Sequence, residues 1–180
     1  MSKSDFETKS LVFVILIGYS LNLVCTAIGF LFNPSHELLH YQIANAFAIS
    51  ACTMAGRYTG MRGQHVAASA YILLGIAHGI SLASVGHASI NPDRGVMMAI
   101  PMIPAFIFMF WCSLYPIWLR IAGLIPGIIF LLVFINVQSG ASYFGWLLSS
   151  GYAALQILEV VWGVYLYNDW KKLASEKTDQ

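Results

Sequence analysis

Six long apolar stretches dominate the chain. They lie at about residues 11–32, 41–56, 65–85, 96–114, 118–137 and 143–167. A helix needs about twenty mostly apolar residues to cross the hydrocarbon core of a bilayer, where its backbone polar groups are all paired internally. The pattern therefore predicts an all-α fold: a single membrane-embedded domain over residues 1–180, a polytopic bundle of six transmembrane helices. The second stretch is the shortest, and its helix is long enough to span the membrane only if it begins near Ser35.

The composition agrees with a lipid environment. Hydrophobic residues make up 58% of the chain and charged residues only 9%, whereas soluble domains have about 25% charged residues. The net charge of +1 provides no basic surface, so we expect the bilayer as a partner and no nucleic acid. Cys25, Cys52 and Cys112 all lie inside apolar stretches, where cysteine usually serves as a small buried hydrophobe.

The basic residues predict the orientation of the bundle. Loops rich in lysine and arginine stay on the cytoplasmic side of a membrane. With six spans, all nine basic residues except Arg94 fall on one side: Lys3, Lys9, Arg57, Arg62, Arg120, Lys171, Lys172 and Lys177. Both termini are therefore expected in the cytoplasm, and a bacterial inner membrane is the location that we favour.

Two glycine pairs predict close helix contacts. Gly75 and Gly79 are four residues apart in the third stretch, and Gly123 and Gly127 have the same spacing in the fifth. Small residues at this spacing let two helix backbones approach each other inside a membrane.

Glu159 is the most informative polar residue, because it lies deep within the sixth stretch. An acidic side chain at the centre of a membrane helix costs about 2.5–3.5 kcal/mol on insertion scales, so it should face protein or water and not lipid. Tyr152 and Gln156 precede it by seven and three residues, which places all three on one face of the helix. We expect this polar stripe to face the interior of the bundle.

Other stretches offer partners for this stripe. His78 lies at a similar depth in the third stretch, Asn22 in the first and Asn45 in the second. Histidine titrates near neutral pH, so His78 and Glu159 together suggest a titratable pair. The alternative is that these side chains only hydrogen-bond to one another and hold the helices in register.

The favoured function is a transporter or channel with a polar pathway inside the bundle for a small solute or ion, and a link to protons is part of this hypothesis. The pathway or binding candidates are Glu159, His78, Gln156, Tyr152, Asn22 and Asn45. A second hypothesis is an accessory or structural subunit without a site of its own, with a homo-oligomer or a membrane complex as its partner. The sequence favours a non-enzymatic role and identifies no cofactor.

A third hypothesis is a metal-dependent membrane enzyme. Residues 36–40 read HELLH, a motif in which a helix presents two histidines to zinc, with the glutamate as general base. Asp93 and His87, near the next outer loop, would supply further ligands. The simpler interpretation is that Ser35 caps a helix and that Glu37, in its first turn, complements the helix dipole.

The HELLH motif together with Asn-Pro-Asp at residues 91–93 resembles the site-2 proteases, a family of intramembrane zinc enzymes. The resemblance would make His36, His40 and Asp93 the metal ligands and Glu37 the general base. It covers only these two short segments. The chain also departs from the family pattern, because Arg94 lies between Asp93 and the following glycine.

Overall fold

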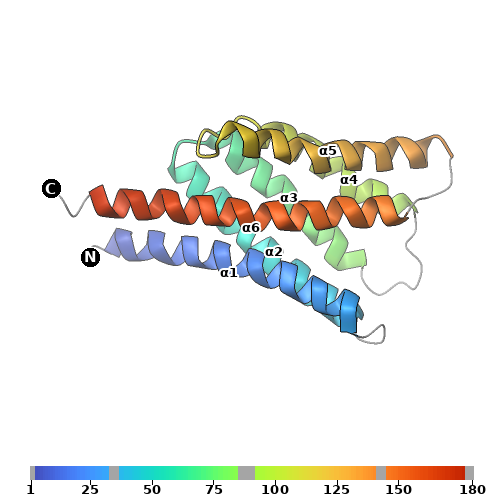
Figure 1. Ribbon diagram of the computed structural model, residues 1–180, viewed down its shortest axis with the longest axis horizontal. Helices are drawn as coiled ribbons and strands as arrows, with labels where there is room; N and C mark the ends of the chain where they lie inside the picture. The colour runs from blue at the N-terminus through green and yellow to red at the C-terminus, as the bar shows by residue number, and fades with distance from the viewer. Residues whose placement is uncertain (1–2, 33–36, 85–91, 141–144, 177–180) are drawn as a thin grey trace.

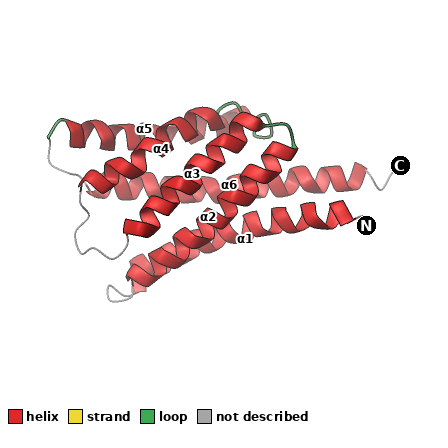
Figure 2. Cartoon of the chain, turned by 180° about the vertical axis from the view of Figure 1, so that it is seen from behind, coloured by secondary structure: helices red, strands yellow, loops and turns green. Residues whose placement is uncertain are grey.

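The structure is a computed structural model that describes residues 3–32, 37–84, 92–140 and 145–176. These residues form helices and turns without any strand (Figures 1 and 2), so the all-helical prediction is confirmed. The helices are α1 (Lys3–Phe32), α2 (Glu37–Met61), α3 (His65–Ser84), α4 (Pro92–Met109), α5 (Ile117–Gln138) and α6 (Gly145–Glu176).

Four of the described helices are long and apolar enough to cross a membrane. Their qualifying segments are Glu7–Leu31 in α1, His65–Ala83 in α3, Ile117–Gln138 in α5 and Gly145–Glu176 in α6. In α4 the apolar part is shorter, Val96–Met109. Length and composition therefore support four of the six predicted spans.

Four helices differ in length from the apolar stretches that predicted them. α1 begins at Lys3, eight residues before its stretch. The second helix is longer than its stretch because it continues through polar residues to Met61. α4 ends at Met109, earlier than expected, because the amides of Trp111 and Cys112 bond to the carbonyls three residues before them, at 3.2 and 3.0 Å. Such bonds tighten and end an α-helix. α6 continues through its polar end to Glu176.

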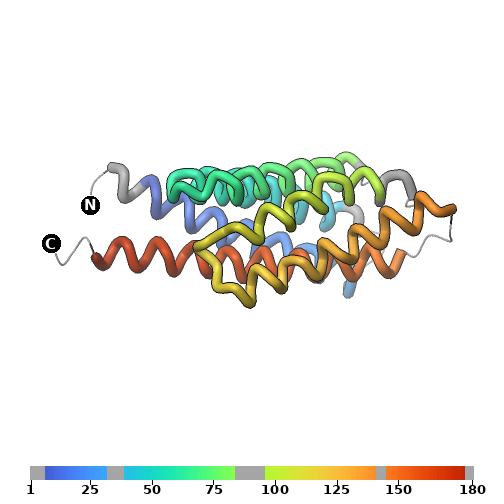
Figure 3. The backbone as a smooth tube through the Cα atoms, turned by 90° about the horizontal axis from the view of Figure 1, so that it is seen from above, coloured from blue at the N-terminus to red at the C-terminus, as the bar shows by residue number. Residues whose placement is uncertain are grey.

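The helices close into a ring. Each helix packs against its neighbours in sequence, and α6 returns to pack against α1. Both termini lie at the same end of the bundle in two perpendicular views (Figures 1 and 3), together with the α2–α3 and α4–α5 turns. This arrangement places side chains of α1, α2, α3 and α6 around a common interior.

The surface of the bundle is apolar, and its interior contains polar groups. Ile121, Ile125 and Ile128 on α5 are each more than half exposed, at spacings of four and three residues. The buried polar side chains are Asn22, Asn45, Thr59, His78, Gln156 and Glu159. A soluble protein would have the opposite distribution, whereas lipid solvates the exposed apolar stripes.

The two glycine pairs differ in how closely they approach other helices. A Cβ atom on Gly127 would lie 3.0 Å from Cβ of Phe106 on α4, which is a tight contact. A Cβ atom on Gly75 would lie 3.5 Å from Cβ of Cys52 on α2, but no described atom lies within 4 Å of one on Gly79. The expected close contact is therefore wrong for Gly79.

Candidate functional site

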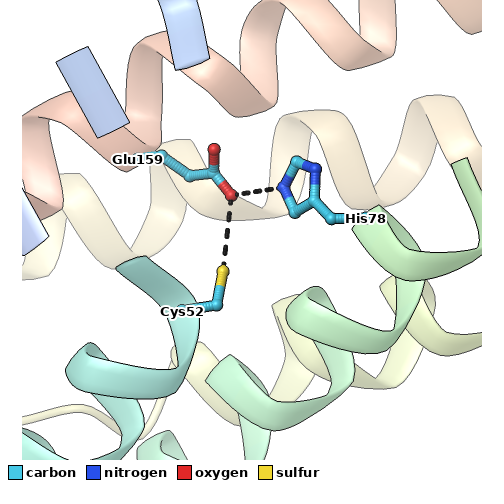
Figure 4. Close-up of side chains that lie close together, drawn as sticks. All are labelled: Cys52, His78 and Glu159. Atoms are coloured by element: carbon cyan, nitrogen blue, oxygen red, sulfur yellow. Dashed lines mark hydrogen bonds and ion pairs between the residues drawn. The ribbon is translucent and has the colours of Figure 1, made fainter. Parts of the chain in front are cut away.

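Glu159 lies at the centre of a hydrogen-bond network that joins four helices. Its side chain is fully buried on α6. Asn22 of α1 donates from Nδ2 to Glu159 Oε2 at 3.0 Å, and Nε2 of His78 on α3 lies 2.8 Å from Glu159 Oε1. The thiol of Cys52 on α2 points toward the same Oε1 at 3.9 Å (Figure 4). The carboxylate thus contacts one polar side chain from each of the other three helices.

The second ring nitrogen of His78 has equally defined partners. Nδ1 lies 3.0 Å from Oδ1 of Asn45 and 3.1 Å from the hydroxyl of Tyr152. Nδ2 of Asn45 donates to the carbonyl of Tyr41 at 2.8 Å, which fixes Oδ1 as the amide atom that faces His78. Because Oδ1 can only accept, this geometry assigns a proton to Nδ1.

One proton remains to be assigned between His78 and Glu159. With Nδ1 protonated, a neutral His78 presents only a lone pair at Nε2, and a carboxylate presents only lone pairs at Oε1. Two acceptors 2.8 Å apart repel each other. The contact therefore requires a proton between them, either on Nε2 as an imidazolium–carboxylate pair or on Oε1 as a neutral pair.

The network continues along α6 and α1. Gln156 donates from Nε2 to Oδ1 of Asn22 at 3.1 Å and to the hydroxyl of Thr26 at 2.7 Å. Asn22, Thr26 and Gln156 thereby link the buried carboxylate to a partly exposed hydroxyl on α1. We call the whole set the Glu159 network: Tyr19, Asn22, Thr26, Asn45, Cys52, His78, Tyr152, Gln156 and Glu159.

The structure brings together all six residues that the sequence suggested for an interior pathway. It adds Tyr19 and Cys52, which sequence reasoning missed. The hydroxyl of Tyr19 donates to Sγ of Cys52 at 3.4 Å. Their sequence positions indicated that they could lie near the network. Tyr19 precedes Asn22 by three residues and Cys52 follows Asn45 by seven, so each shares a helix face with a polar residue of the network.

The outer-face metal hypothesis falls mostly outside the described residues. His36 and His87 lie in segments that the structure does not describe, and only the backbone of Asp93 is described, in the first turn of α4. His40 is partly buried on α2. The ligand set of the HELLH motif stays a prediction.

A second polar cluster joins α2 and α6 at the end of the bundle that carries the termini. Arg62 donates from Nε and Nη2 to the carboxylate of Asp169, at 2.9 and 3.3 Å, and Tyr58 donates to the same carboxylate at 2.7 Å. The hydrogen bond to Asp169 raises the pKa of the Arg62 guanidinium. This cluster therefore holds an ion pair at the end of the bundle that carries the termini.

Two surface hollows in the described part of the bundle do not reach the network. One lies between α1 and α2 and is lined by residues such as Leu11, Met54 and Arg57. Another lies between α2 and α3 and is lined by residues such as Ile49, Thr53 and Ile72. Neither is lined by a residue of the Glu159 network.

Comparison of the chain with protein-family models, with curated proteins and with solved structures gives no match.

Proposed function

We propose that this chain is a small integral membrane protein that carries protons through its bundle, alone or in exchange for a small solute or ion. The 2.8 Å contact between Nε2 of His78 and Oε1 of Glu159, both fully buried, is the single observation that supports this proposal. A titratable pair deep in a membrane bundle is costly and marks proton relays and ion paths more often than an ordinary packing position.

The complete burial of the pair favours a proton over a solute as the species that moves through the structure described here. His78 and Glu159 are both 0% exposed. A solute would need an open cavity at this position. A proton needs only a succession of groups that can donate and accept hydrogen bonds, and Tyr152, Asn45, Tyr19 and Cys52 surround the pair with such groups.

Polar groups also continue toward the end that carries the termini. Asp169 lies ten residues beyond Glu159 on α6, or about 15 Å along the helix axis. The hydroxyls of Tyr71 on α3 and Tyr115 are hydrogen-bonded to each other, and Tyr71 lies one helical turn from Gly75, which packs on Cys52. Tyr71 and Tyr115 thus provide hydroxyl groups at an intermediate depth.

The proposal includes six spans in a bacterial inner membrane with both termini in the cytoplasm. Two observations support this orientation. Eight of the nine basic residues fall on one side of a six-span chain, and both termini lie at one end of the bundle. The polar part of α2 would then be accommodated because Asn45 and Thr59 are buried, while the exposed hydroxyls of Ser50 and Thr53 bond to carbonyls of their own helix.

Proton flux into vesicles tests the function. Purified protein is reconstituted in liposomes that contain a pH-sensitive dye, and an imposed pH gradient drives the flux. Glu159→Gln keeps the shape of the side chain but removes its titration, so flux should fall to the rate of empty vesicles. Glu176→Gln is the matched control, because it makes the same change at an exposed position of the same helix, and it should leave flux unchanged. Equal flux in the two variants would rule out the proposed role of Glu159.

A structural or accessory subunit is the second candidate. The Glu159 network favours this candidate, because its buried polar side chains are hydrogen-bonded to one another across helices. Such polar contacts between membrane helices stabilise a bundle by about 0.6 kcal/mol each on average. This candidate predicts that the wild-type protein carries no flux above empty vesicles and that Glu159→Gln instead weakens assembly with a partner subunit or a second copy. Co-purification from membranes under mild detergent measures that assembly.

A further inference from the structure

We infer that Cys52, His78 and Glu159 form a binding site for a divalent transition-metal ion that accepts sulfur ligands, with Zn²⁺ as its simplest representative. These three side chains come from α2, α3 and α6 and converge at the centre of the Glu159 network (Figure 4). Binding at this site is independent of the proposed proton flux. The exchange of the ion for protons, described below, rests on that proposed function.

The donor atoms already lie near the positions that a metal ion requires. Sγ of Cys52, a ring nitrogen of His78 and a carboxylate oxygen of Glu159 all lie within 4.8 Å of one another. A tetrahedral zinc ion with bonds of about 2.0–2.3 Å places its ligands about 3.3–3.6 Å apart. The separation of Nε2 and Oε1 is 2.8 Å and that of Sγ and Oε1 is 3.9 Å. Adjustments of about 1.5 Å or less, within the range of side-chain rotations, would complete the geometry.

Each ligand is also held by a partner on its other side. Asn45 Oδ1 accepts from Nδ1 of His78, which turns the lone pair of Nε2 toward the site. Asn22 donates to Oε2 of Glu159 and leaves Oε1 facing the site, while the hydroxyl of Tyr19 donates to Sγ of Cys52. Metal-binding histidines and carboxylates are typically oriented by such outer hydrogen bonds.

Charge balance selects a divalent ion. A bound metal has a thiolate, a carboxylate and a neutral imidazole as its ligands, with a total charge of −2. A divalent ion makes the site neutral, which a buried position in a membrane bundle strongly favours. The sulfur ligand excludes Mg²⁺ and Ca²⁺, which prefer oxygen, and fits zinc-like ions.

Loading the site exchanges one metal ion for two protons. Without metal, Cys52 carries its thiol proton and the His78–Glu159 pair shares one proton, so the site is neutral. When the ion binds, the S–H bond and the shared N–H or O–H bond break, and three metal–ligand bonds form. Both protons leave and the site is neutral again. Loading therefore moves no net charge into the bundle, because one divalent ion enters as two protons leave.

Direct zinc binding to the full-length protein tests the site. Purified, reduced protein in detergent is titrated with Zn²⁺ in competition with a coloured chelator, in a weakly buffered solution with a pH indicator. We expect one tightly bound ion per chain and two protons released per ion. Cys52→Ser, His78→Gln and Glu159→Gln should each weaken binding at least tenfold. Cys25→Ser and His40→Gln, which alter the same residue types elsewhere, should have no effect.

A second measurement distinguishes loss of the metal site from misfolding of a variant. Co²⁺ bound to the wild-type protein should show a sulfur-to-metal charge-transfer band that disappears in Cys52→Ser while the thermal unfolding temperature stays within a few degrees of the wild type. Absence of stoichiometric zinc, or binding that Cys52→Ser leaves unchanged, would overturn the inference. Loss of binding in His40→Gln alone would instead assign the ion to the outer HELLH motif and would also overturn it.

The zinc-binding assay and the proton-flux assay test the two proposals separately. A protein that binds zinc with release of two protons but carries no flux in vesicles would retain the metal site and contradict proton carriage. A protein that carries proton flux but binds no zinc would contradict the metal site alone.

Discussion

The geometry of the site depends on both ring nitrogens of His78, because each has its own partner. Its Nδ1 faces an oxygen whose orientation is fixed by the contact of Asn45 with Tyr41, and its Nε2 faces the carboxylate of Glu159. Because an acceptor faces Nδ1, a proton must lie between Nε2 and the carboxylate oxygen, on one or the other. A fixed histidine orientation of this kind suits both a proton relay and a metal ligand.

Asn22 should stabilise the fold through its hydrogen bonds to Glu159 and Gln156. Asn22→Leu keeps a similar volume but leaves one buried carboxylate oxygen without its donor, so we expect a loss of about 1–3 kcal/mol in unfolding free energy. Ser50→Ala is the control, because the exposed hydroxyl of Ser50 bonds only to its own helix at Ala46. Unfolding in mixed detergent micelles measures both variants. Equal stability of the two would show that Asn22 contributes nothing to holding the helices together.

Cys112 should react slowly with maleimides. It is buried in the turn between α4 and α5, and burial raises the pKa of its thiol to about 11. Because only the thiolate is nucleophilic, the alkylation rate at pH 8 should be at least about a hundredfold below that of an exposed cysteine and should increase about tenfold per pH unit until the pH approaches 11. Mass spectrometry of protein with Cys25 and Cys52 replaced by serine follows the reaction. A rate matching that of an added cysteine at exposed Lys172 would contradict the assigned burial.

At the scale of the element, α6 organises the bundle. One face of this helix carries Gln156, Glu159 and Gly163 toward the other helices. A Cβ atom on Gly163 would lie 3.4 Å from the ring of Tyr19, so α6 and α1 approach closely just beside the network. Close backbone packing here is what brings the amide of Asn22 within reach of the carboxylate.

The contact between α1 and α2 depends on Gly18. A Cβ atom at this position would lie 2.9 Å from Cβ of Ala51 and 3.1 Å from the carbonyl oxygen of Phe47. Gly18→Ala should therefore cost about 1–3 kcal/mol through overpacking. Gly79→Ala is the control, since no described atom lies within 4 Å of the added methyl group, and it should be neutral or stabilising by up to about 1 kcal/mol. Thermal unfolding in detergent compares them, and equal effects would contradict the close α1–α2 approach.

At the scale of the whole molecule, the distribution of polarity is that of a protein dissolved in lipid. Apolar side chains such as Ile72, Ile76 and Ile125 are at least half exposed, while Glu159 and His78 are completely buried. Two titratable groups in such an interior require compensation. The hydrogen bonds of the Glu159 network stabilise these two buried groups. The proposed metal ion would also stabilise them, because both would bind it as ligands.

Cysteine accessibility tests the topology. Single cysteines at Lys9 and Lys172 should be protected from a membrane-impermeant maleimide added to intact cells, whereas a cysteine at Ser139, in the turn after α5 at the opposite end, should be labelled. Disruption of the membrane should expose all three positions. Labelling of only one of the first two in intact cells would contradict a bundle with both termini on one side.

The order of apolar and polar residues by itself determined the six helices, their approximate bounds and the faces that carry polar groups, because hydrophobicity and the 3.6-residue period are local properties. It therefore indicated that Glu159, Gln156 and Tyr152 share one face and that His78 and Asn22 lie at compatible depths. Only the tertiary structure decided which atoms meet. The rotation and register of each helix depend on packing contacts such as those of Gly18 and Gly163. These contacts bring Cys52 beside His78 and Glu159, whereas the sequence indicates only that Cys52 shares a helix face with Asn45.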